Sequence, residues 1–381
     1  MKILLALDSF KGSMSAREAM DAFALGVHEV APDTQIESMA ISDGGDGLLG
    51  SLSAVLSDMG FTERTVSVTG PYLESVQARY LIKGATAVLE MAQASGLVLT
   101  DEANRRTLDA TSFGTGEMML DAIRAGATSL VMGLGGSATN DLGLGAMQAL
   151  GVQFYDEEGQ LIQTPIRASD LGRVSRIGLE PFTNLTSEIN VTAVCDVDNP
   201  LLGKRGATAV FGPQKGLQAG DFEILEAGMA KVARLIESSL EVAIADRPAC
   251  GAAGGMGAAL CAFMDADLLP GIDCVLDLLQ FDRALDGVDY VVTGEGRLDY
   301  QSLAGKAPAG VTRRANDAGI KVIAVAGQNQ LTQEHCRAMG IEAIYDLMSI
   351  ARDTSDAMKN AKLHMRTLGR EVAQKHFMNN N

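Results

Sequence analysis

The stretch KILLALDSFKGSMSAREAMDAF, residues 2–23, decides the class of fold. It opens with KILLAL, an almost wholly apolar run that is typical of a strand buried on both faces of a parallel sheet. Ser15 and Glu18 then have the spacing of a capping box, and the apolar residues that follow keep a helical period, so we expect a helix that Pro32 ends. The run QIESMAI at 35–41 is a second expected strand. Together these segments predict a β-α-β unit.

The last third of the chain repeats this pattern, whereas the middle breaks it. We expect strands at DYVVTG (289–294), KVIAVAG (321–327) and AIYDLMS (343–349), with a helix after Pro308 and another from about Thr332. In the middle, TERTVSVTG, VQARYLI and TAVLEMA lie close together between glycine turns. That arrangement is typical of an antiparallel or mixed sheet.

This contrast predicts an α/β protein of two domains, for which a chain of 381 residues is long enough. A doubly wound, Rossmann-like parallel-sheet domain is expected from both chain ends, residues 1–60 and 281–381. A second α/β domain of mixed sheet, residues 61–280, is inserted in it. We expect the active site in the cleft between the two domains.

Composition and charge limit the partners. A net charge of −17 argues against nucleic acid and anionic membranes as general partners. The five cysteines are odd in number and include no CxxC pair, which is typical of reduced thiols in the cytoplasm. The four histidines lack the spacing of a zinc site, and no apolar run approaches the ~18 residues of a membrane span. We expect a cytoplasmic protein and leave its oligomeric state open.

Two loops in the first β-α-β unit carry charged side chains beside glycines. DSFKGSMS at 8–15 follows the first strand, where Lys11 could receive a phosphate or carboxylate at a helix N-terminus. SDGGDG at 42–47 follows the second strand, and its Asp43 and Asp46 suit a divalent metal or a substrate hydroxyl. Both loops are also compatible with ordinary turns that cap the next helix.

The stretch GLGGSATNDLGLG, residues 133–145, follows an apolar run and resembles a phosphate loop. Its glycines allow a close backbone path, its short polar side chains add donors, and amides exposed at a helix N-terminus favour an anion. It lacks the lysine of a Walker loop and the spacing of a dinucleotide fingerprint. Asp141, near its end, could reach a metal or cap the following helix.

Three further loops carry charge. In CDVDNPL at 195–201, Asp196 stands at a strand end, where a buried carboxylate could orient a hydroxyl or bind Mg²⁺, although a structural turn is the rival interpretation. GPQKG at 212–216 supplies Lys215. TGEGRLDYQSLAGKAP at 293–308 leaves a strand and crowds together four charged residues, namely Glu295, Arg297, Asp299 and Lys306.

Several glycine loops with lysine and aspartate therefore follow expected strands in both domains. Phosphoryl transfer requires groups of these kinds: a metal and lysines that neutralise phosphate charge, loops that position the reacting groups in line, and a carboxylate that accepts or orients the hydroxyl proton. The sequence offers no Ser/His/Asp constellation and no zinc cluster. The pattern favours an enzyme that handles phosphates.

These motifs in this order resemble the bacterial glycerate kinase family, type 1: DSFKGSMS, SDGGDG, SFGTGE, GGSATND, CDVDNPL, FGPQKG, AAGGMGAAL and TGEGRLDYQS with GKAP. The likeness extends from residue 1 to about 350. It implies a two-domain α/β protein and ATP- and Mg²⁺-dependent phosphorylation of D-glycerate in the catabolism of glycerate and sugar acids. The 2- and 3-hydroxyls require the same groups, and of the two products we favour 2-phosphoglycerate.

The roles of single residues are chemical hypotheses based on their place at strand ends. As catalytic residues we expect Asp196, to orient or deprotonate the hydroxyl, and Lys11, to neutralise phosphate charge. For ATP and its phosphates we expect Gly135, Gly136, Ser137, Thr139, Asn140, Gly294, Glu295 and Lys306. For glycerate we expect Asp43, Lys215 and Arg297, and for Mg²⁺ we expect Asp46 and Asp141.

Other functions stay open at this point. The chain could be a kinase for another small hydroxy acid or polyol, or a nucleotide- or metabolite-sensing protein without catalysis. The number of charged residues on several loops argues against the second alternative, because binding alone needs fewer. A dinucleotide oxidoreductase is the weakest alternative, since the first strand is followed by DSFKGS and not by GxGxxG.

Overall fold

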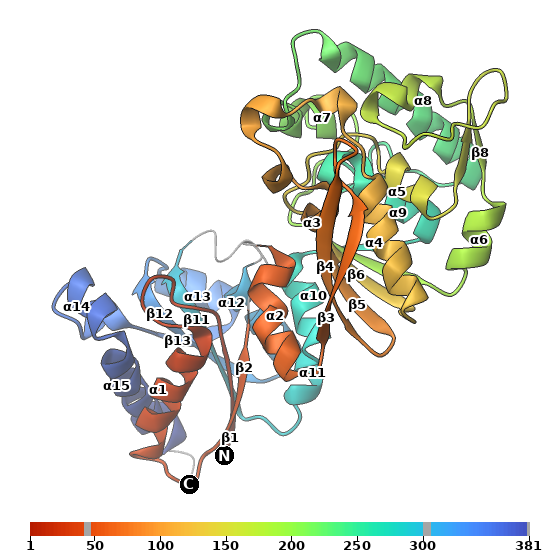
Figure 1. The fold of residues 1–381 in the computed structure, drawn as a ribbon. Coiled ribbons are helices and arrows are strands. Elements are labelled where there is room, and N and C mark those ends of the chain that lie inside the picture. The colour runs from red at the N-terminus through yellow and green to blue at the C-terminus, as the bar shows by residue number, and fades with distance from the viewer. Residues whose placement is uncertain (42–46, 300–305, 379–381) are drawn as a thin grey trace. The chain divides into compact units, whose positions relative to one another are not determined.

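The computed structural model describes residues 1–41, 47–299 and 306–378. The chain forms two compact units, Met1–Gly45 with Ile272–Asn381 and Asp46–Gly271 (Figure 1). The predicted boundaries after residues 60 and 280 differ from this division. Helix α2 (Leu48–Asp58) belongs to the second unit because it packs on strands of that unit's sheet, burying Leu52 and Leu56 completely.

The first unit contains a five-stranded parallel sheet in the order β13-β12-β11-β1-β2. Its strands are β1 (Lys2–Leu7), β2 (Gln35–Ala40), β11 (Tyr290–Leu298), β12 (Lys321–Asn329) and β13 (Ile341–Asp346). Its helices include α1 (Ala16–His28), α10 (Gly271–Leu278, from its second residue), α11 (Phe281–Ala284), α12 (Ala307–Asp317), α13 (Gln333–Met339), α14 (Thr354–Lys359) and α15 (Ala361–Val372). The prediction of a doubly wound domain built from both chain ends is confirmed.

Both faces of this sheet are covered by helices. Successive side chains of β12 point to opposite faces, and those on each face are buried in a core of their own. Ile323 and Val325 join the core with α1 and α15, while Ala324 and Ala326 join the smaller core on the other face with α13. Helix α1 begins at the predicted capping box, in which the Ser15 side chain accepts from the Glu18 N–H, and it ends at His28, ahead of Pro32.

The second unit contains a six-stranded mixed sheet in the order β10-β9-β6-β5-β4-β3. Its strands are β3 (Thr62–Thr69), β4 (Ser75–Lys83), β5 (Thr86–Glu90), β6 (Ser129–Gly133), β9 (Asn190–Val194) and β10 (Asp267–Leu269). Strands β3, β4 and β5 pair antiparallel, and β5, β6, β9 and β10 run parallel, so the predicted mixed sheet is confirmed.

Helices pack on this sheet around one large core. They include α3 (Ala92–Ser95), α4 (Phe113–Arg124), α5 (Leu144–Ala149), α6 (Glu180–Thr186), α7 (Ala207–Phe211), α8 (Asp221–Leu240) and α9 (Met256–Met264), whereas α2 packs separately on β4 and β5. A short antiparallel pair, β7 (Gln153–Tyr155) and β8 (Arg176–Gly178), completes the unit. Because β5, β6, β9 and β10 are parallel, their carboxyl ends lie at one edge of the sheet.

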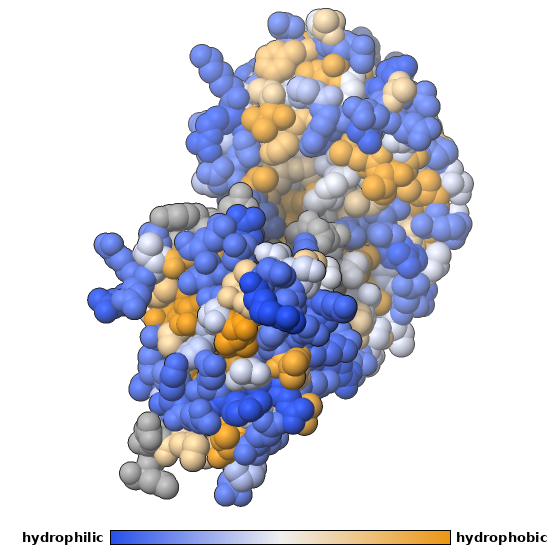
Figure 2. Space-filling view, turned by 90° about the vertical axis from the view of Figure 1, so that its left-hand side faces the viewer, coloured by the Kyte–Doolittle hydropathy of each residue, from blue (hydrophilic) through white to orange (hydrophobic). Residues whose placement is uncertain are grey.

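The surface shown in Figure 2 is mainly hydrophilic, as expected for a chain with a net charge of −17. Hydrophilic residues predominate on the face in view, and apolar residues lie between them (Figure 2). Within the described part of the chain, every helix is too short or too polar to span a bilayer.

Candidate functional site

The strand order of the first unit identifies where a ligand is expected. The chain passes from β1 to β2 on one side and later returns to pair β11 with β1 on the other. In open α/β sheets, ligands bind outside the carboxyl ends of the strands at such a switch point. The loop with Lys11 follows β1, and Gly294 to Arg297 form the end of β11. These predicted residues therefore lie at the expected edge.

The Lys11 loop and the end of β11 are in direct contact. The Asp8 N–H donates to the Gly294 carbonyl over 2.9 Å. A Cβ added at Gly296 would lie 3.4 Å from the backbone nitrogen of Lys11, at van der Waals contact with the loop. The structure thus brings the backbones of Lys11, Gly294 and Glu295 together.

The remaining predicted residues of the first unit are placed differently. Arg297 is exposed, donates to Gln330 over 2.9 Å and lies 3.5 Å from the carboxylate of Asp299. Lys306 is the N-cap residue of α12. Asp43 and Asp46 lie outside the described residues, so their roles stay predictions.

In the second unit, the loop after β6 has an exposed tip on a buried base. Gly135 and Gly136 are exposed, whereas Ser137, Thr139 and Asn140 are at most 5% exposed. Asn140 Nδ2 donates to Thr208 Oγ1 over 3.0 Å. Ser137, Thr139 and Asn140 thus form the buried base of the loop, whereas Gly135 and Gly136 form the part that is open to solvent. The predicted contacts of the three side chains with phosphates stay a prediction.

Lys215 lies beneath this loop. It is 2% exposed, and its Nζ donates to Ser137 Oγ over 3.0 Å and to the Thr139 carbonyl over 2.7 Å. Burial lowers the pKa of Lys215 to about 7, against the opposing effect of the Asp141 charge. The expectation that Lys215 contacts the glycerate carboxylate is therefore corrected, because its ammonium group is buried and already bonded to the loop.

Asp141 is fully buried and its carboxylate is occupied by the protein. It accepts from the N–H and Oγ of Ser112, both over 2.7 Å, and from the N–H groups of Gly143 and Gly145 over 3.2 and 3.3 Å. Burial raises its pKa, which these hydrogen bonds oppose. Ser112 and Gly143 are the N-cap residues of α4 and α5. Asp141 therefore caps helices, and the expected role as a Mg²⁺ ligand is corrected.

This cap predicts a stability effect. Replacing Asp141 with alanine leaves four buried donors without their acceptor, so the free energy of unfolding should fall by about 3 kcal/mol or more. Urea unfolding followed by circular dichroism measures it. The control is Asp156→Ala, which removes one exposed turn bond to Gln160 and should cost less than about 1 kcal/mol. Equal losses in the two variants would contradict the capping role.

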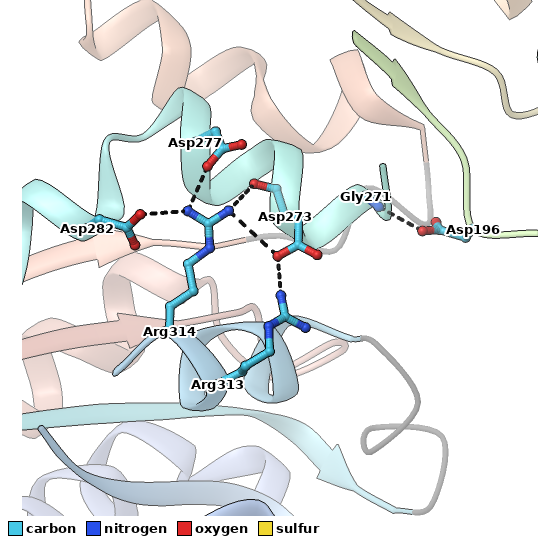
Figure 3. A network of polar contacts seen from close by, with 7 residues as sticks. All are labelled: Asp196, Gly271, Asp273, Asp277, Asp282, Arg313 and Arg314. Atoms are coloured by element: carbon cyan, nitrogen blue, oxygen red, sulfur yellow. Dashed lines mark hydrogen bonds and ion pairs between the residues drawn. The ribbon is translucent and has the colours of Figure 1, made fainter. Parts of the chain in front are cut away.

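Asp196 lies two residues beyond the end of β9 and is exposed, which corrects the expectation of a buried carboxylate. Its Oδ1 accepts from the N–H of Gly271, the first residue of α10, over 2.8 Å (Figure 3). Strand β9 pairs with β6, and the Leu134 N–H donates to the Val194 carbonyl over 3.1 Å. The loops carrying Asp196 and Gly135 thus begin at neighbouring strand ends.

Sequence reasoning missed Glu90, the last residue of β5. It is 7% exposed, and its Oε1 accepts from the Leu48 N–H over 3.0 Å. Burial raises its pKa. The sequence pattern that led to Asp196 could also have indicated Glu90. Both are acidic residues at the end of an apolar run, which for Glu90 is TAVLE.

In each unit, therefore, glycine loops and charged groups lie at the sheet edge where the parallel strands end. The family model of the glycerate kinase family matches residues 3–376. The chain belongs to this family. Glycerate kinases of Halalkalibacterium halodurans and Bacillus subtilis are 37% and 39% identical to it, with 97% and 98% of this chain and 97% of each relative covered. The Glycerate 2-kinase of Escherichia coli K12 is 38% identical, over 98% of this chain and 97% of its own.

A solved structure supports the same family assignment. The crystal structure described as glycerate kinase 2 from Salmonella typhimurium LT2 superposes with a TM-score of 0.81 at 39% identity, covering 98% of both chains. This member of the glycerate kinase family is therefore a kinase with the α/β fold of its relatives, and the family implies ATP as co-substrate. Among the residues that the structure describes, no three histidine, cysteine or acidic side chains gather as a metal site.

Proposed function

We propose that this kinase transfers the γ-phosphoryl group of ATP to the 2-hydroxyl of D-glycerate, forming 2-phosphoglycerate in the catabolism of glycerate and sugar acids. The observation that carries the proposal is the family match over residues 3–376. The choice of the 2-hydroxyl is supported by the name Glycerate 2-kinase of the Escherichia coli relative, with which the chain shares 38% identity.

We assign the hydroxyl proton to Asp196. Its carboxylate is exposed beyond a strand end, and the Gly271 N–H orients one of its oxygens. Among the residues that the structure describes, the other oxygen is open to a substrate hydroxyl. The exposed amides of Gly135 and Gly136 would hold phosphate oxygens. Lys11, whose loop contacts Gly294, and Lys306, the N-cap residue of α12, would neutralise phosphate charge. Arg297 and Asp43 would bind glycerate.

Mg²⁺ is part of the proposal as the companion of ATP, whose phosphate charge it would neutralise. Magnesium usually keeps several waters and needs only one or two carboxylates besides phosphates. Asp141 does not fit as a ligand because its oxygens accept four protein donors. Asp46 stays the candidate ligand.

Phosphorus NMR tests the proposed reaction. Protein incubated with ATP, Mg²⁺ and D-glycerate should yield ADP and one new phosphomonoester signal, which added authentic 2-phosphoglycerate should reinforce and 3-phosphoglycerate should not. A signal that matches 3-phosphoglycerate would reverse the regiochemistry. No turnover with D- or L-glycerate would refute the proposal. Turnover with other hydroxy acids or polyols would then favour the alternative kinase, and ATP binding without consumption would favour a sensor.

A further inference from the structure

Glu90 joins two glycine-rich segments that the sequence places far apart. It stands opposite Gly133 in the parallel pairing of β5 with β6, and the Met91 N–H donates to the Gly133 carbonyl over 2.9 Å. Gly133 begins the stretch GLGGSATNDLGLG. A Cβ added at Gly133 would lie 3.7 Å from Glu90 Cγ and 3.1 Å from Leu48 Cβ. The start of this loop is therefore packed between Glu90 and the beginning of α2.

On its other side, Glu90 holds the end of the SDGGDG segment. Its Oε1 accepts from the N–H of Leu48, the first residue of α2, across 42 positions of sequence. Gly47, the last residue of SDGGDG, has φ +99°, and a Cβ there would lie 2.8 Å from the same oxygen. A residue with a side chain would thus meet both a strained backbone and the carboxylate.

The carboxylate also supplies what α2 lacks locally. The first turn of α2, LLGS, has no acidic residue, and its N-cap residue is a glycine. A negative charge is favoured at a helix N-terminus, where backbone N–H groups lack helical partners. That interaction offsets part of the cost of burying Glu90, whose pKa burial raises.

We infer that Glu90 is a positioning residue of the kinase: it holds the end of the SDGGDG loop in place beside the start of the GLGGSATNDLGLG loop. The inference rests on the proposed function, in which the Gly135–Gly136 amides of the second loop hold phosphate oxygens; on the side of the first loop it uses only Gly47 and Leu48. Misplacement of reacting groups by about 1 Å can cost roughly a hundredfold in rate. Glu90 acts through these loops and does not itself take the proton.

Two variants of Glu90 distinguish its role in holding Leu48 from any role of its negative charge. Glu90→Gln keeps an oxygen that accepts from Leu48 and should keep kcat within about threefold of wild type, with an unchanged pH profile. Glu90→Ala removes the acceptor and should lower kcat by roughly tenfold or more. The matched control is Glu117→Ala, which removes another long-range carboxylate bond, to the Thr69 N–H over 2.6 Å, and should leave kcat near wild type.

Hydrogen–deuterium exchange of peptides covering 47–52 and 133–137 gives a readout independent of catalysis. Exchange should rise in Glu90→Ala and stay at the wild-type level in Glu90→Gln. A glutamine variant as impaired as alanine, with an altered pH profile, would overturn the inference because it would mean that Glu90 titrates in the reaction. Wild-type kcat in Glu90→Ala would overturn it as well. If wild type itself does not phosphorylate glycerate, the proposed function fails, and the exchange result still tests the anchoring.

Discussion

Replacement of Asp196 by asparagine is expected to lower kcat for glycerate phosphorylation by roughly a hundredfold or more. The amide oxygen of asparagine can still accept from the Gly271 N–H, so the N-terminus of α10 keeps its contact. What the variant loses is the carboxylate that would accept the hydroxyl proton. Release of ADP in a coupled assay at saturating ATP and glycerate measures the change.

Asp198→Asn is the matched control. Asp198 is exposed two residues further along the same loop and forms an ion pair with Arg205 over 3.0 Å. Exposed ion pairs contribute little, so this variant should keep near-normal turnover. If Asp196→Asn also keeps turnover within a few-fold of wild type, another group takes the proton and Asp196 only caps the helix.

Replacement of Lys215 by methionine is expected to lower kcat/KM by roughly a hundredfold. Methionine fills a similar volume but leaves Ser137 Oγ and the Thr139 carbonyl without their buried donor. The loop base should shift, and the exposed Gly135–Gly136 amides with it. The arginine variant should not restore activity, because the planar guanidinium does not fit a site built around a compact ammonium. Wild-type kinetics in Lys215→Met would refute the supporting role.

Lys215 also predicts a pH dependence of stability. Its pKa is about 7 in the folded chain and 10.5 ordinarily, with burial as the main cause. Between these values the unfolded chain binds a proton here that the folded chain does not, so the stability of wild type relative to Lys215→Met should rise with pH. The slope approaches about 1.4 kcal/mol per pH unit. Below pH 7 the difference should be constant, since both states are protonated.

Urea unfolding of wild type and Lys215→Met at pH 6, 8 and 9.5 tests this dependence. Taking the difference between the two proteins cancels the titration of other groups to the extent that they are unaffected by the substitution. Parallel stability curves would show that Lys215 titrates near its ordinary pKa and that its burial is not maintained in solution.

The large elements of the fold were predictable because their signals are local. KILLAL is apolar enough for a buried strand, Ser15 and Glu18 meet within one turn, and Pro308 lies in the first turn of a helix. The contrast between the chain ends and the middle predicted a discontinuous domain, since strands that alternate with helices build parallel sheets and closely spaced strands do not. The predicted boundary after residue 60 lies beyond α2, whereas the two units divide before this helix. The sequence did not indicate this because Leu52 and Leu56 pack on strands that they meet only in the folded chain.

The direction of the polar side chains was not predictable. Lys215 lies 78 positions from Ser137, and no local pattern indicates that its ammonium group is turned inward to the loop. For Asp141 the sequence allowed a metal ligand or a cap, and the contacts with Ser112, which lies 29 positions away, appear only in the folded chain. Glu90 was missed because its partner, Leu48, is apolar and contributes a backbone N–H that no side-chain motif reveals.

By itself, therefore, the sequence determined the five strands of the parallel sheet and the strands β3, β4 and β5 of the mixed sheet. It also determined that strand ends carry glycine loops with lysine and aspartate, and which family these motifs resemble. Hydrophobic periodicity, caps and turns act over a few residues and can be read along the chain. The tertiary structure alone decided which charged groups face outward, as Asp196 does, and which are buried supports, as Lys215 and Asp141 are. Burial and hydrogen-bond partners depend on segments that meet only in the folded chain, and they determine what each charge can do.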